Sequence, residues 1–363
     1  MKAVKGRALL DVKSGYYLVN PYILIDGNRI VDIKFNQPSN CSHLIKTDLI
    51  LLPGLADAHC HLTYGFDSRG RFGFTNPTEE ELYQIGLDNM SKILSAGFTT
   101  VRDLGSPVNL ILRLEDAMKE LLILSSGEPI FSEQDLSEQI RRCCRQPVAW
   151  IKVFNGLNEK GQPLFNDEQI GEIVTEAERY GKYVAVHAHE PEAIKASVAG
   201  GARSIEHGTF IDDEAIEMML DHGTYLCPTL MLPYHYLANR ERFNFPESNW
   251  NFFRKMKHYG IKSAQRAHQA GIPIVLSTDA VAGIPGHNAK EFIYLKKAGL
   301  SPLEAIAAST TTAAELLNYP IGVISSGRDA DIIGVYSDPL NELSTLQNVP
   351  FVMANGKIIK NDL

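Results

Sequence analysis

Histidines and aspartates stand together at several points of this chain, each time after an apolar run. Asp57, His59 and His61 alternate in "LLPGLADAHCH", and His187 and His189 alternate in "VAVHAH". Because side chains along a strand alternate between its two faces, the members of each group share one face. Imidazole and carboxylate groups are the ligands that zinc and related divalent ions bind in proteins. The spacing therefore predicts metal-binding residues at the ends of strands.

Two further strand ends carry the same chemistry. His207 ends the run "ARSIEH", and Asp279 follows the run "IPIVLST". A lone histidine is more often a packed or surface residue, and we interpret the histidines on expected helices and loops in this way: His222, His235, His258 and His268. Four strand ends that each offer histidine or aspartate favour a metal centre instead.

Lys152 lies in the apolar run "AWIKVF", with Trp150 and Phe154 on the same strand face. Burial of an ammonium group is costly and lowers its pKa. A neutral lysine amine can react with carbon dioxide to give a carbamate, whose two oxygens can bridge two metal ions. The alternative is a structural ion pair with a carboxylate. We predict that Lys152 is carboxylated and lies at a divalent metal centre, for which zinc is favoured and manganese, iron or cobalt also fit.

Apolar runs that alternate with helical stretches must position these residues. The runs rich in β-branched residues cover 51–59, 99–104, 121–130, 148–154, 183–189, 202–207, 224–230 and 272–280. Helical stretches such as 76–97, 166–181, 212–223 and 249–271 open on Asn or Asp and close on Gly. This alternation over 53–325 predicts a (β/α)8 TIM barrel, whose active site lies at the carboxyl ends of the strands. A doubly wound sheet is the alternative, but no GxGxxG motif follows the first run.

The two ends of the chain have a different pattern. Residues 1–52 and 326–363 contain short β-rich runs with turn signals at "DGN" and "NG". We therefore expect both ends to join in one small β-sandwich domain beside the barrel, which takes residues 53–325. In the expected helix 249–271, we interpret Trp250, Phe252 and Phe253 as residues that pack on the barrel, and a subunit interface is the alternative.

Composition limits the class of partner. The 363 residues are 44% hydrophobic and 21% charged, with a net charge of -8, which argues against nucleic acid or an anionic membrane as a main partner. No apolar run approaches the ~20 residues of a membrane helix, and the first residues lack a signal-peptide pattern. The cysteines are odd in number and scattered, which favours a reducing cytoplasm: Cys41, Cys60, Cys143, Cys144 and Cys227. We expect a small molecule, the substrate, as the partner. Whether the chain forms a homo-oligomer is left open by the sequence.

The motifs, taken in order, resemble those of the amidohydrolase superfamily. "PGLADAHCH", "IKVF", "VAVHAH", "IEHG" and "STDA" carry the resemblance. The stretch over 187–230, "EAIAASTTTAAELL" and "GRDADIIGV" are similar to its imidazolonepropionase-like and Xaa-Pro dipeptidase-like branch. The resemblance covers nearly the whole chain and implies a barrel with a terminal β domain. It also implies hydrolysis of an amide C–N bond, in a dipeptide such as Xaa-Pro or an N-acyl amino acid, by a hydroxide that bridges two metal ions.

The resemblance also implies roles for individual residues. Its metal ligands correspond to His59, His61, Lys152, His187, His207 and Asp279. The histidines of the first motif and Asp279 would bind one ion, the other two histidines would bind the second ion, and carboxylated Lys152 would bridge both. Asp279 would also act in catalysis, by carrying the proton from the water to the leaving nitrogen.

Three residues near these motifs are placed around the metal ligands rather than among them. Asp57 would support the first motif by orienting its histidine ligands. His189, on the same strand face as His187, is placed in the substrate region. His287 lies in the loop "GIPGHN" after the last strand, where contact with substrate and exposure to solvent both stay open. The short segment after the third run, 125–140, predicts an open site on that side.

Glu190 supplies the main alternative. It follows His187 by three residues, the HxxE spacing of the family's deaminases and imidazolonepropionases, in which the glutamate carries a proton beside one metal. Those enzymes generally lack the lysine of the fourth strand, so Lys152 favours the two-metal site. A mononuclear deaminase or cyclic-amide hydrolase is thus the second hypothesis. A non-catalytic assembly protein is the third, and the complete ligand set argues against it.

Overall fold

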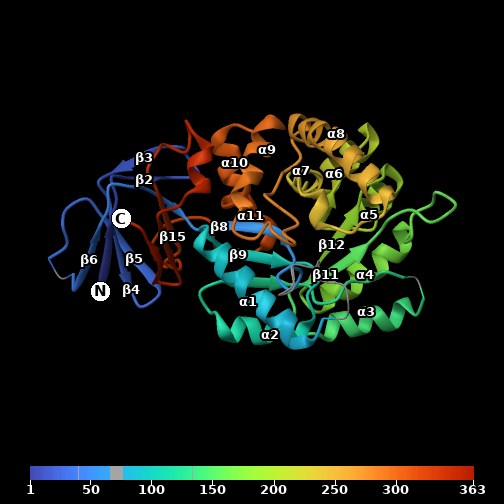
Figure 1. Ribbon diagram of the computed structural model, residues 1–363, viewed down its shortest axis with the longest axis horizontal. Helices are drawn as coiled ribbons and strands as arrows, with labels where there is room; N and C mark the ends of the chain where they lie inside the picture. The colour runs from blue at the N-terminus through green and yellow to red at the C-terminus, as the bar shows by residue number, and fades with distance from the viewer. Residues whose placement is uncertain (40, 66–76, 133) are drawn as a thin grey trace.

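Parallel strands form the wall of a barrel in the computed structural model, which describes residues 1–39, 41–65, 77–132 and 134–363 (Figure 1). The strands of the wall are β8 (Leu55–Cys60), β9 (Phe98–Asp103), β10 (Leu122–Ser125), β11 (Trp150–Phe154), β12 (Tyr183–Ala188), β13 (Ser204–His207) and β14 (Tyr225–Cys227). They pair in the orders β10-β9-β8 and β11-β12-β13-β14, and every one of these pairs is parallel. Parallel strands joined by helices have their carboxyl ends at one rim, where the predicted ligands stand.

Residues 273–280 close the barrel in the eighth position, although their backbone is not a regular strand. On one side, the backbone N–H of Val275 donates to the carbonyl of Leu226 at 2.9 Å. On the other side, the N–H of Ala58 donates to the carbonyl of Leu276 at 2.9 Å. The segment therefore bonds to β14 and to β8, and the predicted barrel is confirmed.

The predicted run 121–130 is interrupted in the structure. Strand β10 ends at Ser125, and only Ile130 returns to the sheet, in a single parallel bridge to Val153. The backbone N–H of Ile130 donates to the backbone carbonyl of Lys152, and the carbonyl of Ile130 accepts from the backbone N–H of Phe154, both at 2.9 Å. This short segment links β10 to β11 and delivers the residues after it to the rim of the barrel.

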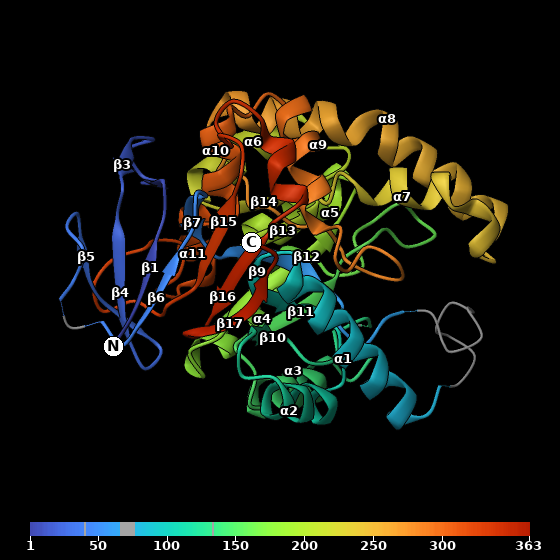
Figure 2. The same cartoon turned by 60° about the vertical axis from the view of Figure 1, so that its left-hand side comes forward.

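Helices surround the barrel in the described part of the chain (Figures 1 and 2). They are α1 (Glu79–Ser95), α2 (Val108–Ala117), α3 (Leu136–Arg145), α4 (Asp167–Arg179), α5 (Pro191–Ala199), α6 (Asp213–His222), α7 (Leu232–Ala238), α8 (Glu247–Ala270), α9 (Glu291–Lys297), α10 (Pro302–Ala308) and α11 (Thr311–Leu317), with short 3-10 turns at Arg240–Arg242, Asn288–Lys290 and Leu343–Gln347. None of the helices in these described ranges is long and apolar enough to cross a membrane.

Side-chain caps explain where several predicted helices begin. Asn166 forms a capping box with Gln169 at the start of α4, and Asp212 caps α6 through the N–H of Ala215. Thr78 caps α1, whereas Asn76, where that helix was expected to begin, lies outside the described residues. Helix α8 begins two residues before its predicted start.

Two β-sheets formed by the ends of the chain pack beside the barrel (Figure 1). One has the order β5-β4-β1-β6, from β1 (Lys2–Lys5), β4 (Tyr22–Asp26), β5 (Arg29–Lys34) and β6 (His43–Lys46). The other has the order β17-β16-β15-β7-β2-β3, from β2 (Ala8–Leu10), β3 (Tyr17–Val19), β7 (Ile50–Pro53), β15 (Ile332–Val335), β16 (Phe351–Ala354) and β17 (Lys357–Asn361). The expected β domain from both termini is confirmed, and its boundaries at 52/53 and 325/326 stay a prediction.

The central strands β7, β15 and β16 of the six-stranded sheet are buried on both faces, as their continuous apolar runs require. Leu51 and Ile332 pack into the cluster between the two sheets, whereas their neighbours Leu52 and Ile333 belong to the cluster of the barrel. Gly54 lies between β7 and β8. Only glycine fits there, because a Cβ would lie 2.2 Å from Oγ1 of Thr99. The run 51–59 is therefore two strands, one in each domain.

Candidate metal centre

His59, His61 and Asp279 meet where β8 ends beside the closing segment. Nε2 of His61 lies 3.0 Å from Oδ1 of Asp279, and Nε2 of His59 lies 3.5 Å from the same oxygen. One ligand atom from each residue falls within 4.8 Å of the others. Asp279 has a φ of +51°, a left-handed conformation that is rare for a non-glycine residue and costs roughly 1–3 kcal/mol. Backbone strain of this kind is typical of functional sites.

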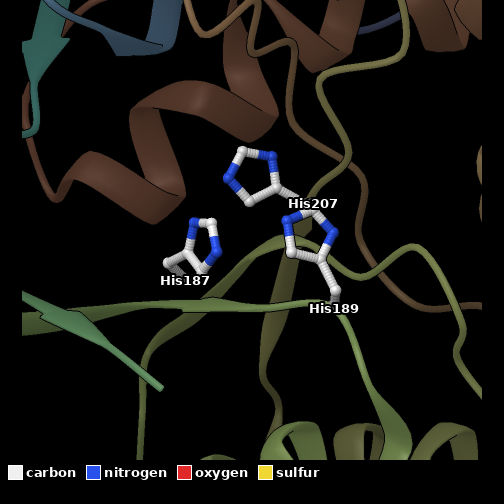
Figure 3. Close-up of side chains that lie close together, drawn as sticks. All are labelled: His187, His189 and His207. Atoms are coloured by element: carbon white, nitrogen blue, oxygen red, sulfur yellow. The ribbon is translucent and has the colours of Figure 1, made fainter. Parts of the chain in front are cut away.

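A second group, His187, His189 and His207, gathers at the ends of β12 and β13 (Figure 3). The two strands are adjacent and parallel, with Ala188 beside His207. The ring centroids of His187 and His207 lie 4.6 Å apart, as do those of His189 and His207. One ligand atom from each histidine lies within 4.8 Å of the others, so this group can also bind a metal ion.

Threonine hydroxyls fix the orientation of two of these rings. Nδ1 of His207 lies 2.7 Å from Oγ1 of Thr229, and Nδ1 of His189 lies 2.8 Å from Oγ1 of Thr209. A ring that donates from Nδ1 to a hydroxyl presents the lone pair of Nε2 to a metal ion. His207 and Thr229 both have positive φ, +72° and +49°, so the backbone is strained at both partners.

Lys152 is fully buried beside both histidine groups. Its Nζ lies 3.5 Å from Nε2 of His59, and its charge helps to lower the pKa of His187 and His207. Burial lowers the pKa of Lys152 itself to about 8, although the nearby carboxylates, that of Glu206 above all, oppose this shift. A substantial fraction of the amine is therefore neutral near physiological pH, which is the form that carboxylation requires.

Glu206 and Arg102 form a buried ion pair beneath the first group, and neither residue belongs to the site predicted from sequence. Nη2 of Arg102 donates to Oε1 of Glu206 at 2.8 Å, and the hydroxyl of Ser204 donates to the same oxygen at 2.6 Å. The other oxygen, Oε2, lies 2.8 Å from Nδ1 of His59. Burial acts to raise the pKa of Glu206, but Arg102 and His59 lower it to about 2, so the carboxylate is an anion.

Asp57 lies behind the first group and does not point at the ligand atoms. Its oxygens accept from the hydroxyl of Thr278 at 2.5 Å and from the side-chain amide of Asn288 at 2.7 Å. Its contact with His59 runs through the backbone N–H at 3.2 Å. Burial raises the pKa of Asp57 to about 6, and these hydrogen bonds limit the shift. Asp57 thus ties β8 to the residue before Asp279, and the ring of His59 is oriented by Glu206 instead.

Two residues of the predicted set lie apart from the metal ligands. Glu190 is the N-cap residue of α5, is half-buried, and does not line the cavity over the histidines. This position gives the HxxE alternative no support, and that alternative stays a hypothesis. His287 lies beside Lys92 and Gly286 in a separate hollow of about 580 Å³, which touches neither ligand group.

A cavity of about 360 Å³ opens over the ligands at the rim of the barrel. Both groups reach it, through His61 and Asp279 on one side and through the second histidine group on the other. Phe131, in the segment between β10 and β11, and Phe154, at the end of β11, form part of its wall. A substrate in this cavity would contact both groups at once.

The donor set fits two divalent ions. Metal ligands must be neutral imidazoles or ionised carboxylates. Burial lowers the pKa of His59 to about 4 and of His189 to about 3, and it holds those of His187 and His207 well below the ordinary value. Burial acts to raise the pKa of Asp279, but the neighbouring histidines outweigh it and keep the carboxylate ionised. The side chains are thus in the forms that bind metal.

Comparison with known proteins agrees with this geometry. The profile of the amidohydrolase family matches residues 50–359. The crystal structure of a Xaa-Pro dipeptidase with bound methionine in the active site superposes with a TM-score of 0.90 and 28% identity, covering 98% of this chain and 99% of that one. Ochratoxinase from Aspergillus niger is 31% identical over 202 residues, 54% of this chain and 42% of its own length. Imidazolonepropionase from Thermoplasma volcanium is 20% identical over 394 residues, 94% of this chain and 91% of its own.

Proposed function

This chain belongs to the amidohydrolase family and is a metal-dependent hydrolase of carbon–nitrogen bonds, and we propose that it uses two divalent ions, bridged by carboxylated Lys152, to cleave an amide. The position of Lys152 carries the proposal. Its Nζ lies 3.5 Å from Nε2 of His59, and its charge acts on His187 and His207 of the other group. A carbamate on this amine would supply one oxygen to each ion.

The proposed ligands are His59, His61 and Asp279 for one ion, His187 and His207 for the other, and carboxylated Lys152 for both. We propose zinc, because imidazole and carboxylate ligands suit it. His189 faces the same cavity, and we place it beside the second ion and the substrate. The ions, when bound, lower the pKa of water and polarise a carbonyl group.

Asp279 performs the proton transfer in this proposal. Its carboxylate lines the cavity and is ionised, so it can accept the proton of the attacking water and pass it to the leaving nitrogen. Glu206 lies against Nδ1 of His59 and is paired with Arg102, so this buried ion pair holds the ring. The chain therefore contributes a proton carrier at the cavity and a rigid, charged support behind it.

We propose substrates in which the scissile amide lies close to a carboxylate group. The name of one structural neighbour specifies Xaa-Pro dipeptides, and we extend this to N-acyl amino acids because both present a C–N bond of the same kind. Cyclic amides, which the similarity to imidazolonepropionase suggests, are the second candidate.

Metal content tests the two-ion site directly. Protein expressed with zinc and bicarbonate is expected to hold about two zinc ions per chain, and Lys152→Met is expected to lose at least one of them. Lys182→Met is the matched control, because Lys182 is also a buried lysine but donates to the carbonyls of Cys143 and Gln146, away from the ligands. A Lys152→Met protein that keeps both ions would overturn the bridge.

A further inference from the structure

Several aromatic side chains are among the residues that line the cavity above the proposed metal ligands. They come from the segment after β8, the residues around Ile130, the end of β11, and the α7–α8 region: Tyr64, Phe131, Phe154, Tyr236, Phe245, Phe252 and Phe253. In the described part of the chain, no lysine or arginine is among the residues that line this cavity. The wall is thus suited to an uncharged, flat group rather than to a charged side chain.

One wall is a stack of rings that leads from the surface to the metal ligands. Phe131 stacks on Phe154 with centroids 4.7 Å apart and planes inclined by 25°. Phe154 stacks in turn on His187 at 4.5 Å and 28°. Phe131 is 57% exposed, which is unusual for a phenylalanine that also lines a cavity. An exposed ring in this position offers apolar surface that a bound substrate would cover.

Helices α7 and α8 supply a second group of aromatic rings to the cavity wall. Phe252 of α8 meets His189 edge to face, with centroids 4.8 Å apart and planes inclined by 86°. Behind it, Tyr236 of α7 stacks on Phe253 at 4.6 Å, which holds these two helices together. Aromatic rings prefer offset-stacked or edge-to-face neighbours. A flat ring entering this cavity would find aromatic neighbours from the residues around Ile130 and β11 and from α7 and α8.

We propose that the substrate carries an uncharged aromatic ring next to the scissile amide, and that Phe131 and Phe252 are specificity-determining residues for it. This proposal rests on the amide hydrolysis proposed above and narrows its substrate class to N-acyl aromatic amino acids and dipeptides of phenylalanine, tyrosine or tryptophan. The ring lies against these aromatic side chains, and the amide reaches the ligands at the base of the cavity.

The test compares substrates that differ only in aromaticity. Zinc-loaded protein is assayed with N-acetylphenylalanine, N-acetylcyclohexylalanine and N-acetylleucine, and with the dipeptides that carry the same three side chains before proline. We expect kcat/KM to be about 3- to 10-fold higher for the phenyl compound than for the cyclohexyl compound, because the two have similar size and only the phenyl group can stack.

Variants locate the preference. Phe131→Leu and Phe252→Leu are expected to remove most of this ratio, mainly through KM of the phenyl compound, and to leave the cyclohexyl compound within about twofold. Phe35→Leu is the matched control, since Phe35 is 56% exposed and lies in the segment after β5, outside the barrel. Equal kcat/KM for phenyl and cyclohexyl compounds, or a ratio that both cavity variants keep, would overturn the aromatic preference while amide hydrolysis stands. If the zinc-loaded protein cleaves none of these amides, the proposed function itself fails for this substrate class.

Discussion

Nδ1 of His59 lies 2.8 Å from Oε2 of Glu206, although the two residues are 147 positions apart in the chain and stand on different strands of the barrel. The other oxygen of Glu206 accepts from Arg102, whose guanidinium lies 4.4 Å from the centroid of Trp150. These residues cross the interior of the barrel from β9 to β13 to β8. A proposed metal ligand is thereby oriented by a carboxylate that is itself fixed by a buried cation.

The first prediction concerns that carboxylate. Glu206→Gln is expected to weaken metal binding at the first group by about 10- to 100-fold, because the amide is a poorer partner for Nδ1 of His59 and leaves Arg102 without a counter-charge. Competition with a chelator measures the affinity. Glu190→Gln is the control, since Glu190 does not line the cavity. If Glu190→Gln lost activity while Glu206→Gln kept its metal, the HxxE hypothesis would replace the two-metal site.

The second prediction separates His207 from His189. Thr229→Val removes the hydroxyl 2.7 Å from Nδ1 of His207 and is expected to weaken binding of the second ion by about 10-fold or more, while Thr229→Ser keeps the hydroxyl and the affinity. Thr209→Val removes the hydroxyl 2.8 Å from Nδ1 of His189 and is expected to raise KM and leave metal content unchanged. Elemental analysis and steady-state kinetics of the three variants check this. Loss of metal from Thr209→Val would make His189 a ligand.

The third prediction follows from the pKa of Lys152, which burial lowers to about 8. Only the neutral amine reacts with carbon dioxide, so the rate at which zinc and dissolved carbon dioxide restore activity to the metal-free protein should rise with pH from 6 to 8 and level off above about 8. An exposed lysine, with a pKa of about 10.4, would still show a rising rate at pH 9. The protein is reconstituted at a series of pH values, and its activity is then assayed at one fixed pH, which gives the rate of reactivation as a function of the reconstitution pH. A rate independent of both pH and carbon dioxide would argue against the carbamate.

The ligand pattern could be predicted from sequence because it depends on local geometry. Side chains alternate along a strand, so His59 and His61 must share a face, and parallel strands bring their carboxyl ends to one rim. The barrel and the β domain from both termini follow from the order of the runs in the same way. The structure brings together all the residues proposed as histidine ligands, with Asp279 beside them.

The partners of buried charges could not be predicted in this way. Glu206 in "SIEH" and Arg102 in "TTVRDL" are visible as charges within apolar runs, which is a signal that each needs a partner. The partner of each charge depends on how the strands are arranged around the closed barrel, and no local sequence pattern encodes that arrangement. Phe252 and Phe253 line the cavity, although their sequence pattern predicts packing residues. The periodicity of a helix does not distinguish a side chain in the core from one in the wall of a cavity.

The last prediction concerns stability and Glu291, a fully buried carboxyl without a cationic partner among the contacts that the structure describes. Its oxygens accept from the backbone N–H groups of Leu230 and Met231, both at 2.7 Å, and thereby hold the turn that follows Thr229. Burial raises the pKa of Glu291 from 4.5 to about 8, and these two hydrogen bonds limit the shift. The folded state therefore binds this proton more tightly than the unfolded state.

The sign of the effect follows from that difference. The contribution of Glu291 to stability is fully present below about pH 4.5 and declines as the pH rises toward about 8, by up to about 1.4 kcal/mol per pH unit. Glu291→Gln, which cannot titrate, should lose this dependence, so the difference in free energy of unfolding between the two proteins should change steadily between pH 5 and pH 8. Urea denaturation of both zinc-loaded proteins measures it, and the pH dependence of metal binding cancels in the difference. Parallel stability profiles over this range would mean that Glu291 ionises in the folded protein as it does in water, and that its two backbone hydrogen bonds offset the cost of burial.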